Sequence, residues 1–267
     1  MLILSVSRLH IAILGAVLSG SLLCSLATAQ SNTPSNSQTS NDPDRAVSIK
    51  GLPDNLLADQ KSIWLFPVSL IHGEHILPVI CLAGATAAFI ATDAHSAPPF
   101  RTTTNFHGFN NAFSGTNTAA MVAGAPAAMY AVGLLRKDAY AQSSALLAAE
   151  AFADAYLLDL PMKAVTARRQ PLSYSGNGPY TDSFFNGTHN PFKSGGFYSA
   201  HAVGAMAVAT VIAHRYGRHR WVPFVAYGLA GAISFSRITT SNHFPGDVVF
   251  GGAMGFVIAR YVVLPPR

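Results

Sequence analysis

Residues 236–247, SRITTSNHFPGD, decide how the rest of the chain is interpreted. An apolar stretch runs into this segment, a short polar loop leads to His243, and Pro245 follows. Proline is favoured in the first turn of a helix, so a new helix is expected to begin there. Asp247 would lie in that turn, where its carboxylate can reach a ring nitrogen of His243. Such a pair fixes the histidine tautomer and leaves the other nitrogen free for attack, although Asp247 would equally suit a plain helix start.

A second polar element, residues 197–201 with the sequence FYSAH, precedes another apolar stretch. Ser199 can cap the helix expected after it, which leaves free backbone N–H groups that bind anions readily. His201 on the first turn could donate a proton to a leaving oxygen. Taken alone, the element equally fits an ordinary capped helix with a surface histidine.

A third element, residues 163–171 with the sequence KAVTARRQP, ends an apolar helix in clustered positive charge. Cations at a helix C-terminus are stabilising, so a solvated basic end is one interpretation. The other is a phosphate clamp, in which Lys163 is a point charge and an arginine is a bidentate donor. An up-and-down bundle can bring all three helix–loop junctions to one end, where they would make a metal-free phosphoryl-transfer site.

With these residues the sequence resembles the type 2 phosphatidic-acid phosphatase superfamily, which includes bacterial class A acid phosphatases and vanadium haloperoxidases. The superfamily carries three motifs in the order Lys-x6-Arg-Pro, Pro-Ser-Gly-His and Ser-Arg-x5-His-x3-Asp. The third motif is matched at every fixed position, from Ser236 and Arg237 through His243 to Asp247. The resemblance covers about half of the chain, from about Ala141 onward, with a motif-bearing core over 141–264.

The resemblance implies a role for each matching position. His243 would be the nucleophile that becomes phosphorylated, Asp247 would orient it, and His201 would protonate the leaving alcohol and later activate water. Four groups would hold the phosphate oxygens: Lys163, Ser199, Arg237 and a backbone N–H near Ala200. The resemblance implies neither a metal nor another cofactor for the phosphatase branch.

Two motifs depart from the superfamily pattern. Gln170 stands where arginine is expected before proline, and Tyr198 and Ala200 replace proline and glycine in the second motif. Arg169 or Arg168 could take the place of the missing arginine, although neighbours on a helix point about 100° apart. The primary hypothesis is therefore a phosphoric monoester hydrolase acting on a lipid phosphate or a small ester. A pseudo-phosphatase that binds phosphate or lipid without turnover is an alternative, and a vanadate-dependent haloperoxidase is a more distant one.

The composition favours a helical membrane protein. Half of the residues are hydrophobic and 11% are charged, against roughly 25% charged residues in a soluble domain. No basic run is long enough to indicate nucleic-acid binding, and the sequence specifies no oligomeric state. We therefore expect an all-α, membrane-associated six-helix bundle of the phosphatidic-acid phosphatase/haloperoxidase type. Its helices are expected near 76–92, 117–135, 142–160, 199–214, 222–235 and 247–264.

The remaining segments suggest how the chain is organised and located. Residues 1–29 are typical of a secretory signal peptide, with an uncleaved anchor as the alternative, and residues 30–60 are expected to be a disordered linker before a helical domain over 61–267. The long loop 171–196 contains five aromatic residues and is either a substrate lid or packed down on the domain. The protein is thus expected in the cell envelope, membrane-associated or soluble in the periplasm.

Charge and chain direction give conflicting orientations. Seven arginines and lysines lie at the end opposite the motifs, which favours a site that faces the periplasm. A cleaved signal would start the chain outside and, after three spans, would place Lys163 inside. Either the signal is retained and an extra segment such as 63–71 re-enters, or 76–92 does not span, or the domain is not inserted. The cations are Arg136, Lys137, Arg215, Arg218, Arg220, Arg260 and Arg267.

Overall fold

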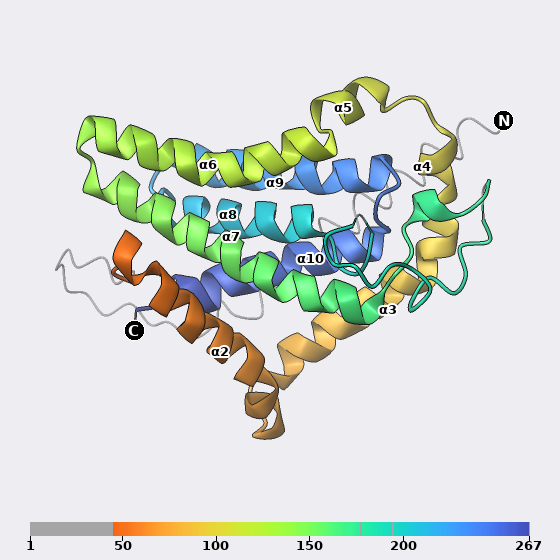
Figure 1. Ribbon diagram of the computed structural model, residues 1–267, viewed down its shortest axis with the longest axis horizontal. Helices are drawn as coiled ribbons and strands as arrows, with labels where there is room; N and C mark the ends of the chain where they lie inside the picture. Colours follow the sequence, from red (N-terminus) through yellow and green to blue (C-terminus); the bar gives the residue numbers. More distant parts are fainter. Residues whose placement is uncertain (1–44, 177, 194, 267) are drawn as a thin grey trace.

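The structure, a computed structural model, describes residues 45–266 apart from 177 and 194 (Figure 1). All regular elements within this part of the chain are helical, which confirms the all-α prediction. The predicted signal peptide and the first part of the predicted linker lie outside the described residues. The long helices are α2 (Leu52–Ile71), α3 (Ile76–Ser96), α6 (Gly115–Arg136), α7 (Ala139–Thr166), α8 (Ala200–Arg215), α9 (Trp221–Thr239) and α10 (Pro245–Val257), which continues as a π-helical stretch (Ile258–Val263).

The six predicted helices correspond to α3 and to α6 through α10, and α2 is an addition. Residues 45–60, which were expected to belong to a linker, instead form a short 3-10 turn (Ile49–Gly51) and the first part of α2. Pro53 lies in the first turn of this helix, where its missing N–H costs nothing. A buried ion pair between Arg45 and Asp59 orders the segment despite its polar composition. Two short helices, α4 (Pro98–Thr102) and α5 (His107–Ala112), connect α3 to α6.

α8 is the central helix of the bundle. It packs against α7, α9 and α10, and its residues are buried on nearly every side. Small residues allow the close contact with α10, because a Cβ atom at Gly255 would lie 2.2 Å from the carbonyl oxygen of Val203. α8 and α10 are therefore held in a fixed register, which fixes the positions of their first turns relative to each other.

Within the described residues, four helical stretches are long and apolar enough to cross a membrane, namely α3, α6, α9 and Pro245–Val263. Their outer faces expose large apolar side chains, including Ile80 at 60%, Leu135 at 85% and Phe224 at 81% of full exposure. A contiguous apolar surface of this kind marks contact with a membrane or another protein. Together with helix lengths suited to a bilayer, it indicates membrane association.

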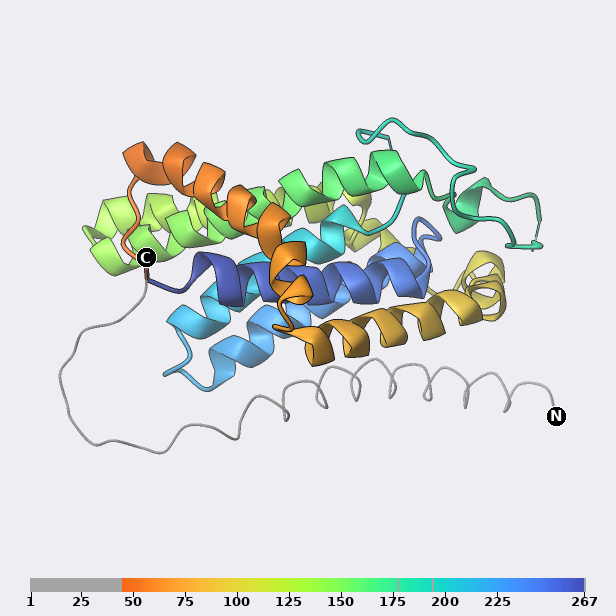
Figure 2. The same ribbon diagram turned by 90° about the horizontal axis from the view of Figure 1, so that it is seen from below.

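The path of the chain places both ends of the described region on the same side of the bundle. α2 and α3 together lead from the end where the C-terminus lies to the opposite end, where α4 and α5 follow (Figures 1 and 2). The backbone N–H of Arg45 donates to the carbonyl oxygen of Leu264 across 3.4 Å, which ties the two ends together. The pair α2–α3 therefore makes one passage along the bundle, so that Arg45 and the start of α4 lie at opposite ends.

Candidate active site

Four of the long helices bring the three motif segments to one end of the bundle. α7 and α9 end there, and α8 and α10 begin there, with the 171–196 loop folded over the same end (Figure 1). Two backbone contacts join the motifs. The N–H of Ser199 donates to the carbonyl oxygen of Asp247 across 3.2 Å, and the N–H of Leu172 donates to that of Ser241 across 2.9 Å. The convergence expected from the sequence is therefore present in the fold.

His243 lies in the tight loop between α9 and α10 and is almost completely buried. Its backbone N–H donates to the carbonyl oxygen of Arg237 across 3.1 Å, and Ser241 turns the loop through a left-handed conformation with φ of 56°. The ring Nδ1 lies 3.4 Å from Oδ2 of Asp247. The same carboxylate oxygen accepts the N–H of Phe244 at 3.0 Å and so caps α10. Asp247 therefore serves as a helix cap and as the neighbour of the histidine ring, which joins the two interpretations of this residue.

The start of α6 contributes two backbone carbonyl groups that the sequence did not reveal. The ring Nε2 of His201 lies 3.1 Å from the carbonyl oxygen of Gly115. Arg237 donates from Nη2 to the carbonyl oxygen of Phe113 and from Nε to Oγ of Ser236 across 3.0 Å. The Arg237 side chain is buried. Both side chains are thus oriented by the same turn of chain.

The predicted phosphate ligands Lys163, Ser199 and Ala200 lie at the end of α7 and the start of α8. Nζ of Lys163 pairs with Oδ2 of Asp159 at 3.1 Å. Ser199 caps α8 by accepting the N–H of Ala202 at 3.4 Å. The N–H groups of Ala200 and His201 are left without intrahelical acceptors, as at any helix start. Two donors, a cation and two histidines therefore gather around one helix N-terminus.

The electrostatics of the two histidines confirm that they share one environment. Burial lowers the pKa of His201 to about 4, and the positive charges of Arg237 and Lys163 lower it further. Burial also lowers the pKa of His243, whereas Asp247 raises it. Lys163 and Arg237 again act in the lowering direction. Both rings are therefore neutral at pH 7, and a bound anion would favour protonation by offsetting the two cations.

Two predicted phosphate ligands do not join this cluster. Nη2 of Arg169 donates to the carbonyl oxygen of Ser173 across 3.1 Å, and its guanidinium stacks 4.1 Å from the ring centre of Tyr174. Oε1 of Gln170 is buried and has no hydrogen-bond partner among the described residues. Arg169 instead packs within the loop, so it does not replace the motif arginine whose position Gln170 occupies.

The sequence analysis missed the central role of Arg168 in the fold of this end. Its side chain is buried and forms ion pairs with both Asp247 and Asp93. Asp93 was missed because the predicted helix 76–92 ends one residue before it, where the apolar run stops. The signal that could have found it is an acidic residue in the last turn of an otherwise apolar helix.

The 171–196 loop combines packed and exposed aromatic residues. Tyr174 and Tyr180 are buried with Phe244 in a small cluster of their own, whereas Phe185 and Phe192 are 68% and 77% exposed. A cavity of about 350 Å³ lies between this loop and α3, and its lining includes Asp93 and Arg168. None of the histidines is among the residues that line this cavity. The buried part of the loop is thus fixed to the bundle, as the packing interpretation expects.

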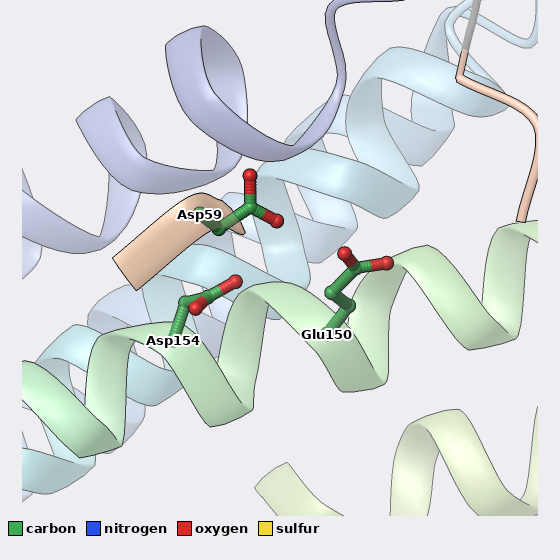
Figure 3. Close-up of side chains that lie close together, drawn as sticks. All are labelled: Asp59, Glu150 and Asp154. Carbon is green, nitrogen blue, oxygen red and sulfur yellow. The ribbon is translucent and has the colours of Figure 1, made fainter. Parts of the chain in front are cut away.

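A second polar cluster lies away from the motifs, between α2 and α7. The carboxylates of Asp59, Glu150 and Asp154 point towards one another (Figure 3), with oxygens within 4.8 Å. This donor set suits a hard cation such as Ca²⁺ or Mg²⁺. However, the guanidinium of Arg45 already pairs with Asp59 and Glu150, so a buried protein cation offsets part of the negative charge of the cluster. The acidic residues of α7 thus face the interior of the bundle, which removes their cost as lipid-facing groups.

The class of this protein is defined by an all-helical, membrane-associated bundle that carries the buried His243, the half-buried His201, a lysine and an arginine at one end. Comparison with protein families identifies the family within this class: residues 142–265 match the family model described as the PAP2 superfamily. The resemblance seen in the motifs is thereby confirmed over this region of the chain. Comparisons with curated proteins and with solved structures give no match. The family match supports a phosphatase-type or related activity.

Proposed function

We propose that the protein is a metal-independent phosphatase that hydrolyses phosphate monoesters through a phosphohistidine at His243. The observation that carries this proposal is the position of the His243 ring, which is buried with Nδ1 facing Asp247. A carboxylate accepts hydrogen bonds only, so this neighbour favours the tautomer with the proton on Nδ1. The lone pair of Nε2 is then available for attack on phosphorus.

The proposed reaction has two steps. In the first step Nε2 of His243 forms a bond to phosphorus while the bond to the ester oxygen breaks, and His201 gives a proton to the departing alkoxide. In the second step a water molecule gives its proton to His201 and forms a bond to phosphorus while the bond from phosphorus to Nε2 of His243 breaks, which releases inorganic phosphate and restores both histidines. The predicted phosphate ligands Lys163, Ser199, Arg237 and the N–H of Ala200 would stabilise the charge on the equatorial oxygens.

The low pKa of His201 fits this scheme. A bound phosphate dianion brings negative charge close to Lys163 and Arg237, and it offsets the cations that lower the pKa of His201. Substrate binding would thus protonate His201 before the leaving group departs. The bound substrate itself therefore promotes protonation of the general acid, His201.

We further propose that the site faces the outside of the cytoplasmic membrane, so that the protein acts in the cell envelope. The cations at the opposite end of the bundle, such as Arg136 at the end of α6 and Arg215 at the end of α8, would then face the cytoplasm. The substrate is a phosphorylated lipid or a small soluble ester. Membrane association favours the lipid, because its headgroup would lie at the level of the site.

The test is hydrolysis of p-nitrophenyl phosphate and of phosphatidic acid by the full chain in detergent, with chelator present. The expected result is activity that His243→Ala abolishes and that the matched control His219→Ala, an exposed histidine at the other end of the bundle, retains. Wild-type protein quenched with SDS at alkaline pH should carry an acid-labile, base-stable phosphoryl group from labelled substrate. Equal activity in wild type and His243→Ala would overturn the mechanism.

Gln170 supports a second candidate, a phosphate- or lipid-binding protein without turnover. Arg168 and Arg169 are both engaged elsewhere, so the site lacks one charged donor whose loss costs roughly a hundredfold or more in rate. The candidate predicts saturable binding of inorganic phosphate to a protein that does not hydrolyse either substrate. Gln170→Arg would then create activity, whereas an active wild type would exclude this candidate.

A further inference from the structure

Asp93, Arg168 and Asp247 form a line of alternating charge that ends at His243. Nη2 of Arg168 pairs with Oδ2 of Asp93, and Nη1 pairs with Oδ1 of Asp247. The other oxygen of Asp247, Oδ2, faces Nδ1 of His243. Each Asp247 oxygen therefore has its own cationic or ring neighbour, and Arg168 lies on the side of the carboxylate away from His243.

The side chain of Arg168 is held in place on all sides. Its guanidinium carbon lies 4.4 Å from the ring centre of Phe184 and 4.5 Å from that of Phe244. Its Nε donates to Oγ of Ser183 across 3.1 Å. The cation thus lies between two aromatic rings, and each of its three nitrogens donates to an acceptor, Ser183, Asp247 or Asp93.

We infer that Arg168 and Asp93 are positioning residues for the proposed reaction, which set the orientation of Asp247 and the charge that His243 experiences. This inference rests on the proposed function. Neither residue matches a motif of the superfamily, because Arg168 precedes the expected arginine position by two residues and Asp93 lies outside the matched region 142–265. The loop packed on Arg168 and the helix α3 thereby contact His243 indirectly, through Arg168 and Asp247.

A purely structural tie between α3 and α10 would need no particular charge, whereas the line of charges makes a directional prediction. Removal of the positive Arg168 leaves Asp247 to act on His243 alone, which favours the protonated ring. Removal of the negative Asp93 leaves Arg168 paired with Asp247 alone. The positive charge near His243 is then less offset, which disfavours the protonated His243 ring. Besides these two, the charged or titratable groups near His243 are Asp247 on α10, Lys163 on α7, Arg237 on α9 and His201 on α8.

The experiment compares pH–rate profiles of kcat/KM for p-nitrophenyl phosphate between wild type, Arg168→Gln, Arg168→Lys and Asp93→Asn. His243 must lose its proton to attack, so the acid limb of the profile reports its protonation. Arg168→Gln should move this limb to higher pH by about half a unit or more, and Asp93→Asn should move it to lower pH. Arg168→Lys keeps the charge but loses the second donor, so kcat should fall at least tenfold with the limb unmoved.

The matched control is Arg260→Gln, an exposed arginine at the far end of the bundle, which should leave the profile unchanged. If Arg168→Gln fails to fold, the Arg168→Lys and Asp93→Asn variants still decide the question. Limbs that coincide with that of the wild type in all variants would overturn the inference. An inactive wild type, or one insensitive to His243→Ala, would instead refute the proposed function.

Discussion

Nε2 of His201 lies 3.1 Å from the carbonyl oxygen of Gly115, the first residue of α6. A carbonyl oxygen can only accept, so the neutral ring carries its proton on Nε2. The free lone pair is then on Nδ1, and a proton taken up by His201 enters there. The start of α6 thus assigns the two nitrogens of this histidine to different tasks.

If His201 is the general acid, the effect of replacing it should depend on the leaving group. His201→Asn should lower kcat for an alkyl phosphate such as glycerol phosphate by a hundredfold or more, because the alkoxide needs a proton. p-Nitrophenolate leaves without one, so its release should fall much less. Steady-state rates and a burst of p-nitrophenol would measure the difference. Equal losses in the burst rate of both esters would remove His201 from this role.

The position of Lys163 depends on Gly196, and this can be tested separately. Gly196 has φ of 87°, and a Cβ atom there would lie 2.8 Å from Cγ of Lys163. Gly196→Ala should therefore displace the lysine and raise KM for phosphate esters about tenfold. Gly176→Ala is the matched control, because φ is 56° and nothing lies within 4 Å.

Both variants carry a similar backbone cost of about 1–2 kcal/mol, which a melting curve would reveal. Only the first should change KM. A rise in KM in both variants would mean that loop strain, rather than contact with Lys163, controls substrate binding.

The titration of His201 should contribute to the pH dependence of the free energy of unfolding. Its pKa is lowered from 6.5 to about 4 in the folded protein, mainly by burial, so the unfolded chain binds more protons between these values. The free energy of unfolding should therefore fall as the pH is lowered from 6.5 towards 4, and should be insensitive to this group above 6.5. His243 acts in the same direction.

Thermal unfolding in detergent at pH 4.5 and 7 measures this effect. The change in Tm between pH 7 and 4.5 should be more unfavourable for the wild type than for His201→Gln, which cannot titrate, by several degrees. An identical loss in the variant would assign the acid sensitivity to other groups.

The sequence predicted the helices and the motif-bearing end well, for physical reasons. The spacing from Arg237 to Asp247 lies within one helix–loop–helix junction, so local rules place these residues together. Arg168 escaped because its importance comes from Asp93, which is distant in sequence and lies in a helix without a motif. α2 escaped in part because buried ion pairs, rather than apolar periodicity, fix its first half. Contacts between distant charged residues leave no periodic pattern to detect.

Arg45 should be essential for stability because its guanidinium pairs with two of three clustered, buried carboxylates. Its guanidinium pairs with Asp59 at 2.8 Å and with Glu150, and Asp154 lies beside them (Figure 3). Removing one partner of a buried ion pair leaves an uncompensated charge and costs about 3–5 kcal/mol. Arg45→Met should therefore lower Tm markedly, whereas Lys50→Met, which removes an exposed cation from the next turn, should change it little.

The same variants decide whether this cluster holds a divalent cation. Because Arg45 occupies the space between the carboxylates, millimolar Mg²⁺ or Ca²⁺ should not raise the Tm of the wild type. In Arg45→Met the three oxygens are released, so either ion should recover part of the lost stability by binding the folded state. A cation-dependent Tm in the wild type would contradict this assignment, because it would mean that a metal binds alongside the arginine.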